Sequence, residues 1–157
     1  MVNLDYIDRE ILKSLQKDAG VSLEMLAGQL SISTNTCWRR VKRLEESGLI
    51  KARVALVDAE KLGMSLTVYV AIKTNDHSKQ WYERFAKQVN QIEQVVEFYR
   101  MAGDVDYVLK VTCSSVHDYD HVYKKLICDV DIADVSASFA MECLKYTTEV
   151  PIKARAN

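Results

Sequence analysis

Apolar residues recur at helical spacing in three stretches of the first 47 residues of the chain. Near the start of the first stretch, Asp5 and Asp8 stand where acidic side chains favour the positive end of a helix. The apolar positions are Leu4, Ile7, Ile11, Leu12 and Leu15 in the first stretch, Leu23, Leu26, Ala27 and Leu30 in the second, and Cys37, Val41 and Leu44 in the third. This spacing predicts three amphipathic helices within residues 4–47.

The third stretch, residues 33–48, contains signals for both ends of a helix. Ser33 can accept a hydrogen bond from a free N–H of the first turn, and Gly48 can adopt the left-handed conformation that ends a helix. Between Ser33 and Leu44 there are four Arg or Lys residues and no acidic residue. The face opposite the apolar positions carries Asn35, Arg39, Lys42 and Arg43.

This cationic face has two interpretations. It can be an ordinary solvated surface, or it can contact the phosphate-lined major groove of DNA, which admits a helix. The preceding residues favour DNA, because the second and third predicted helices are joined by the short polar segment 31–33, with Ile32 as its single apolar residue. A helix, a short turn and a basic helix form the helix-turn-helix pattern.

After these helices the pattern changes to that of strands. Residues 49–57 are rich in β-branched side chains and predict an extended strand that leaves the helical unit. Within it, Lys51 and Arg53 can contact phosphate or form ordinary surface charge. The segment 58–63 interrupts the pattern. A half-buried strand is then predicted by the alternating positions Leu66, Val68, Val70 and Ile72.

The rest of the chain repeats strand and helix. A helix is predicted by Trp81, Phe85, Val89 and Ile92, a strand by residues 95–102, and a tight turn by residues 103–105. The next strand has Tyr107, Leu109, Val111 and Cys113 on one face, a second helix has Tyr119, Val122, Tyr123, Leu126 and Ile127 with Ser115 as its cap, and residues 136–150 supply a last strand. The order βαββαβ is the ferredoxin-like arrangement.

The predicted fold class is therefore α+β. We expect a helix-turn-helix domain at residues 1–50, a strand-like linker at 51–63 and a ferredoxin-like domain at 64–157. The chain has 157 residues and 48% hydrophobic content, enough for one good core or two small ones. Its net charge of −1 does not mark a nucleic-acid binder, so only the local cluster of cations argues for DNA.

The cellular setting is predicted to be the cytoplasm. The chain begins with no signal-peptide-like apolar run and contains no apolar stretch of about 18 residues that could span a membrane. Four cysteines, without a CxxC pair, indicate reduced thiols rather than a disulfide framework. No cofactor is predicted.

The combination of a helix-turn-helix and a ferredoxin-like half resembles the Lrp/AsnC family of transcription regulators. The likeness covers nearly the whole chain and is strongest in ArgArgValLysArgLeuGluGluSerGlyLeuIle at residues 39–50 and GlyAspValAspTyrValLeuLysVal at residues 103–111. The variants ThrCysTrp at 36–38 and TyrArgMetAlaGly at 99–103, with short stretches within 138–148, resemble a subgroup that regulates cysteine breakdown. Cysteine is therefore a candidate effector.

This resemblance implies a mechanism and partners. Family members dimerise, usually assemble further into octamers, bind double-stranded DNA, and use the ferredoxin-like half, called the RAM domain, to bind a small amino acid. Arg39 is the expected base contact, because it points away from the apolar face and Arg commonly pairs with guanine. The recognition residues implied for this chain are Ser33, Thr34, Asn35, Thr36, Trp38, Arg39, Arg40, Lys42 and Arg43.

The resemblance places the effector around the turn at residues 103–107. Asp104 and Asp106 can accept hydrogen bonds from the ammonium of an amino acid, and N–H groups of the turn can donate to its carboxylate. From residue types alone, Gly-Asp-x-Asp is equally an ordinary hairpin turn. The full set of implied effector residues is Met101, Gly103, Asp104, Asp106, Tyr107, Ser136 and Ser138.

Several alternatives stay open at this point. Trp38 is expected to pack against the first helix, with stacking near the DNA backbone as the other interpretation, and Cys37 is expected to be a compact core residue. A thiol- or metal-responsive regulator could use Cys113, Cys128 and Cys143, or His117 and His121, which are four apart on a helix face. We do not expect an enzyme, because neither a phosphate loop nor a GxSxG motif is present.

Overall fold

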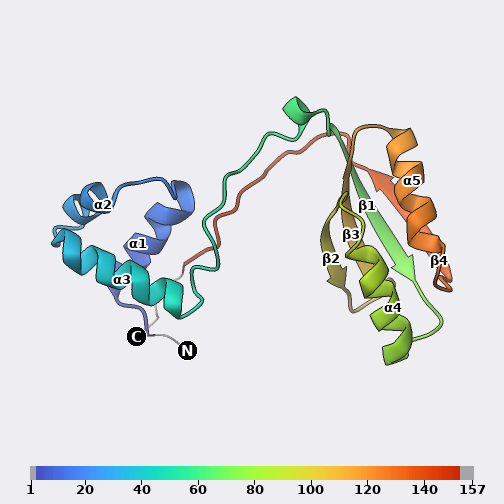
Figure 1. Cartoon of the computed structure of the whole chain (residues 1–157), viewed down its shortest axis with the longest axis horizontal. Coiled ribbons are helices and arrows are strands. Elements are labelled where there is room, and N and C mark those ends of the chain that lie inside the picture. Colours follow the sequence, from blue (N-terminus) through green and yellow to red (C-terminus); the bar gives the residue numbers. More distant parts are fainter. Residues whose placement is uncertain (1–2, 153–157) are drawn as a thin grey trace. The chain divides into compact units, whose positions relative to one another are not determined.

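The computed structural model describes residues 3–152, which form helices and a single sheet (Figure 1). The chain divides into two compact units. One contains residues 3–56 together with residues 145–152, and the other contains residues 57–144. No helix within residues 3–152 is long and apolar enough to cross a membrane.

The N-terminal unit contains the three predicted helices, α1 (Tyr6–Lys17), α2 (Leu23–Gln29) and α3 (Thr34–Glu46). Each helix begins at a side-chain cap, provided in order by Asp5, Ser22 and Ser33. After α3, Gly48 takes a left-handed conformation with φ of 73°, as predicted. The buried core consists of Ile11, Leu26, Ala27, Cys37, Val41 and Leu44, so the apolar faces read from the sequence are confirmed.

The C-terminal unit has the predicted βαββαβ order. After the short 3-10 helix η1 (Glu60–Leu62) come β1 (Leu66–Lys73), α4 (Lys79–Val89), β2 (Val95–Arg100), β3 (Tyr107–Cys113), α5 (Val116–Ile127) and β4 (Asp134–Phe139). The strands pair antiparallel in the order β2-β3-β1-β4. This topology confirms the ferredoxin-like prediction.

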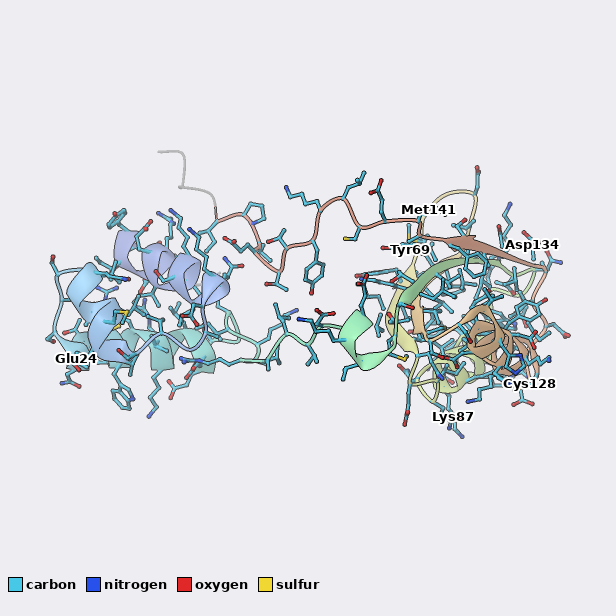
Figure 2. The ribbon with its side chains drawn as sticks, turned by 90° about the horizontal axis from the view of Figure 1, so that it is seen from above. Glu24, Tyr69, Lys87, Cys128, Asp134 and Met141 are labelled. Atoms are coloured by element: carbon cyan, nitrogen blue, oxygen red, sulfur yellow. The ribbon has the colours of Figure 1, made fainter. Side chains whose placement is uncertain are left out.

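The two helices of this unit cover one face of the sheet (Figure 1). The core lies beneath them and contains the inward side chains of β1 and β3 together with Trp81 and Phe85 of α4. The other face of the sheet carries Tyr69, which is 45% exposed. Figure 2 shows Tyr69 on the side of the sheet away from Lys87 and Cys128, which belong to the helical side. The sheet therefore has one covered and one open face.

Two sequence-based strand predictions were wrong. Residues 51–57 lie in neither a helix nor a strand, and β4 ends at Phe139 instead of continuing to residue 150. Their side chains favour extended backbone, but a strand also needs a hydrogen-bonding neighbour, and none of the described residues pairs with either segment as a strand.

Gly28 and Gly48 provide a matched test of the backbone in the N-terminal unit. Neither has any atom within 4 Å of an added Cβ, but only Gly48 has a positive φ. We expect Gly48→Ala to lower the free energy of unfolding by about 1 kcal/mol. Gly28→Ala, inside α2, should raise it by about 0.5–1 kcal/mol. Urea denaturation measures both, and destabilisation of equal size in the two variants would contradict this account.

Candidate DNA-binding surface and ligand site

The exposed side of α3 carries the predicted recognition residues. Arg39, Lys42, Arg43 and Asn35 are all exposed, opposite the buried Cys37. At the start of the helix, the Ser33 hydroxyl accepts a hydrogen bond from the Thr36 N–H (3.2 Å) and lies 2.8 Å from the Thr36 hydroxyl. Thr34 begins the helix and is exposed as well.

Arg39 is the unpaired cation of this surface. No residue among those described forms an ion pair or hydrogen bond with its guanidinium. A guanidinium with free donors on an exposed helix face has the chemistry required to reach a base edge or a phosphate. The structure thus leaves available the side chain that the sequence analysis singled out.

Trp38 does not pack in the N-terminal core. Its side chain is 49% exposed, and the Lys42 Nζ lies 5.2 Å from the centre of its ring, within the range of a cation–π contact. The expectation that Trp38 packs against the first helix was wrong, because the helix rotation that buries Cys37 and Val41 turns Trp38 towards solvent. Lys42 also lies 3.8 Å from Glu46, so Trp38 and Glu46 border its charge.

A buried carboxylate joins α1 to α3. The Asp8 side chain is only 1% exposed, and it accepts hydrogen bonds from Arg40 Nη1 at 2.8 Å and from Arg43 Nη2 at 2.5 Å. Arg40 Nη1 also donates to Asp5 at 2.6 Å. Pairing with hydrogen-bonded guanidinium groups is what makes a carboxylate tolerable at this depth.

These contacts separate the roles of the two arginines. Arg40 was expected to contact DNA, but its side chain is only 26% exposed and its Nη1 is held by the buried Asp8 and the exposed Asp5. Arg43 is 51% exposed while it is bound to Asp8, so part of its guanidinium remains accessible. The structure therefore gives Arg40 an internal position and leaves Arg43 on the surface.

Asp5 adds a pH-sensitive contact to this network. A hydrogen bond from the Asp8 backbone N–H, followed by the contact with Arg40, lowers the pKa of the Asp5 carboxyl below its usual value. A carboxyl group whose pKa is lower in the folded than in the unfolded state stabilises the fold at pH values above its unfolded-state pKa. This contribution is lost as the pH falls through the folded-state pKa of Asp5, so acid weakens the cap of α1.

The sequence analysis missed the partnership of Asp8, although a signal was present. Asp8 lies four residues after Leu4 and three before Ile11, which puts an acidic side chain within the apolar stripe of the first helix. A charge on a buried stripe requires a cationic partner. The identity of the partners, 32 and 35 residues away, is not visible from the stripe itself.

In the C-terminal unit, the turn between β2 and β3 is held by its own residues. Asp106 accepts a hydrogen bond from the Thr74 N–H at 2.9 Å, and its other oxygen lies 3.7 Å from His77 Nδ1. The Met101 N–H donates to the Asp106 carbonyl at 2.8 Å. Gly103 has a φ of 142°, while Asp104 and Met101 are exposed. Asp104 is therefore more accessible to a ligand than Asp106.

The predicted effector residues do not form one cluster within a single chain. Tyr107 is 4% exposed and packs among Trp81 and Phe85 on the covered face of the sheet. Ser136 and Ser138 pair with Ala71 and Tyr69, on the open face. The two serines and the Tyr107 ring thus project from opposite sides of the sheet.

A cavity that the sequence analysis did not predict lies beside Tyr107. Its volume is about 230 Å³, and its lining includes basic side chains from the start of α4 and the end of β2. The lining residues are His77, Ser78, Lys79, Tyr82, Arg100 and Tyr107. The lining brings residues 77–82 together with Arg100 and Tyr107, which are more than 15 positions further along the chain.

The geometry does not favour a thiol or metal sensor. Burial raises the pKa of the Cys113 thiol to about 11, which disfavours the reactive thiolate. His117 and His121 lie with their Nε2 atoms 3.2 Å apart, but residues 3–152 contain no group of three or more side chains that could hold a metal ion. Cys128 and Cys143 are exposed thiols.

Comparison with known protein families gives two matches that together span most of the chain. The sequence model of the Lrp/AsnC ligand binding domain matches residues 67–150. A model of a winged helix-turn-helix DNA-binding domain matches residues 4–51.

Characterised relatives match over almost the full length. The DNA-binding transcriptional activator DecR of Escherichia coli K12 is 46% identical, covering 96% of this chain and 99% of the relative. The glutamate uptake regulatory protein of Zymomonas mobilis is 46% identical, covering 95% of this chain and 91% of the relative.

Solved structures show the same fold. A crystal structure of an AsnC family transcriptional regulator from Agrobacterium tumefaciens is 47% identical, with a TM-score of 0.90 over 94% of this chain and 97% of that chain. A transcriptional regulator from Neisseria meningitidis, solved as a complex with L-Met, is 27% identical, with a TM-score of 0.90 over 95% of this chain and 97% of that chain.

The Asp8 network predicts that removing a buried charge from α1 lowers the free energy of unfolding more than removing an exposed one. Asp8→Asn should lower the free energy of unfolding by about 2–3 kcal/mol, because Arg40 is left half-buried with a weaker partner. Glu10→Gln is the matched control, since Glu10 forms an exposed ion pair with Lys13 at 2.7 Å. That control should cost less than about 0.5 kcal/mol. Urea denaturation measures both, and equal losses would show that the buried network is not stabilising.

Proposed function

The chain belongs to the Lrp/AsnC family of DNA-binding transcriptional regulators, and we propose that α3 reads DNA while the C-terminal unit senses a small amino acid and drives assembly. The relatives are transcriptional regulators and not enzymes, and this chain shares their two domains. The single observation that carries the DNA-binding proposal is the exposed cationic side of α3, on which Arg39 has no internal partner.

Within α3 the cations have different proposed tasks. Arg39 contacts a base edge, because its free guanidinium can donate two parallel hydrogen bonds to guanine. Lys42 contacts a phosphate, since an ammonium group is a point charge without a planar fork. Trp38 lies at the flank of the helix, where its exposed ring can stack near the DNA backbone. The remaining proposed contacts are Ser33, Thr34, Asn35, Thr36 and Arg43.

Arg40 takes a positioning role in this proposal instead of a contact with DNA. Its guanidinium bonds to Asp5 and Asp8 fix the side chain against α1. The same contacts hold α3 at the surface with its cationic side outward. The proposed domain limits are residues 1–50 for DNA binding, 51–63 for the linker, and 64–157 for sensing and assembly.

For the effector we propose an α-amino acid bound at the turn between β2 and β3. Asp104 is exposed and can accept hydrogen bonds from the ammonium, while Asp106 keeps the turn in shape through Thr74. The similar Neisseria regulator was solved with L-Met, and the Zymomonas relative is named for glutamate uptake. Cysteine is a further candidate, from the likeness to regulators of cysteine breakdown. Met101 and Gly103 complete the turn, and Ser136 and Ser138 contribute from the open face.

Assembly into a homodimer, and further into an octamer, is supported by exposed aromatic and aliphatic side chains. On the open face of the sheet, Tyr69 and Tyr99 are 45% and 53% exposed. The two segments that failed to form strands also expose Val54, Leu56, Val57, Leu144 and Tyr146. Exposed side chains of this kind are suited to contact with a second copy of the chain, which could also supply the missing strand neighbour.

The proposed division of α3 can be tested with two substitutions. The two DNA probes are one selected by the protein from a random pool and one unselected. Arg39→Ala should bind the two with more similar affinity than the wild type does, because a base contact is removed. Lys42→Ala should weaken binding to both DNAs about equally. It should also reduce the slope of log affinity against log salt concentration by about one. Lys87→Ala, an exposed lysine of α4, is the control. Fluorescence anisotropy at several salt concentrations measures all three, and equal losses by Arg39→Ala on both DNAs would refute the base contact.

The sensing proposal is tested by thermal melting against each of the twenty amino acids, with a thiol that is not an amino acid as control. A ligand at about a hundred times its dissociation constant should add roughly 2.7 kcal/mol of stability. We expect one amino acid to raise the melting temperature and Asp104→Asn to reduce that shift. Asp134→Asn, at the exposed start of β4, should leave the shift unchanged. If no amino acid acts, the unit does not sense amino acids.

A further inference from the structure

The cavity at the start of α4 has a strongly basic lining for its size. A histidine, a lysine and an arginine line it, and none of its lining residues is acidic. A small anionic group is the kind of ligand that such a lining attracts.

Tyr107 brings a hydroxyl group without an internal partner to this cavity. The residue is 4% exposed, and its ring stacks on Trp81 and Tyr82 with centroid distances of 5.8 Å and 6.4 Å. Among residues 3–152, none forms a hydrogen bond with the Tyr107 hydroxyl. The hydroxyl oxygen is not among the fully buried side-chain atoms that lack a partner, so it is open to solvent and can donate to a ligand. Burial raises the pKa of the phenol, which keeps its proton available for donation at neutral pH.

Arg100 supplies a positive charge beside that hydroxyl. It pairs with Tyr107 across β2 and β3, so both side chains project from the same face of the hairpin. The other two cations already have carboxylate neighbours, since His77 lies 3.7 Å from Asp106 and Lys79 lies 3.5 Å from Glu83. Within the described part of the chain, the Arg100 guanidinium has no ion pair or hydrogen bond.

We propose that this cavity binds the carboxylate of a small ligand, with the Arg100 guanidinium as the charge partner and the Tyr107 hydroxyl as a hydrogen-bond donor. A planar carboxylate matches the fork of one guanidinium, and the hydroxyl adds a further donor. The inference rests on the sensing function proposed above, to which it adds the chemical group recognised and the residues that hold it. Asp104, in the adjoining turn, remains the acceptor for an ammonium group on the same ligand.

The test is isothermal titration calorimetry of the full chain with L-glutamate, L-glutamine and glutarate as probes. Inorganic phosphate at the same ionic strength serves as the anion control. We expect at least one carboxylate probe to bind, and Arg100→Gln and Tyr107→Phe each to weaken that binding by about tenfold or more. Arg84→Gln, on α4 outside the cavity, should bind as the wild type does.

Several outcomes would overturn the proposal. Phosphate binding as tightly as the carboxylates would show an adventitious ion only, and absence of binding by all three probes would exclude the site. Unchanged affinity in Arg100→Gln would also overturn it. Arg100 is exposed and is not part of the core, so this variant remains decisive if Tyr107→Phe does not fold.

The failure of this proposal is distinguishable from failure of the sensing function. If an amino acid found by thermal melting keeps its affinity in both variants, the unit senses that amino acid but this cavity does not hold its carboxylate. If no amino acid binds, the sensing function fails. Glutarate, which has no ammonium group, then still reports whether the cavity binds a carboxylate.

Discussion

The pairing of the Asp8 carboxylate with two arginines of α3 is the interaction on which the proposed DNA-reading surface depends. A carboxylate this deeply buried would be strongly unfavourable alone. Arg40 and Arg43 satisfy it from positions three residues apart, which lie on neighbouring parts of one helix face. Two such attachments fix the rotation of α3 about its own axis as well as its position. The outward direction of Arg39 is therefore a consequence of where Asp8 is buried.

The same pairing does not remove both arginines from contact with DNA. A guanidinium has five N–H donors, and Asp8 uses only part of this capacity in Arg43, which stays half exposed. Arg43 can thus hold α1 and donate to a phosphate at once. Arg40 is more enclosed, with 26% of its side chain exposed, and its Nη1 donates to both Asp5 and Asp8. Two neighbouring cations of equal charge thus differ in exposure, 26% for Arg40 and 51% for Arg43, which composition does not reveal.

Features set by local sequence were predictable, and features set by distant partners were not. Ser33 and Gly48 act on adjacent backbone, so the ends of α3 could be placed from residue types. The alternation along β1 and β3 likewise fixed the covered face of the sheet. Residues 49–57 have strand-forming side chains, but strand formation needs a neighbour that the sequence pattern does not identify. The rotation of Trp38 outward and the link from Asp8 to Arg40 are also products of tertiary packing.

The absence of an internal partner does not by itself mark a cation as functional. Arg84 is exposed on α4 and forms no ion pair or hydrogen bond with a described residue, and the charge of Asp76 acts on it only at longer range. Arg39 differs because it projects from a helix whose rotation is fixed by a buried ion pair. Arg100 differs because it pairs across the hairpin with Tyr107, whose hydroxyl also has no hydrogen-bond partner among the described residues. In each case a second, independently positioned group restricts where the charge can act, and that restriction is what gives binding its specificity.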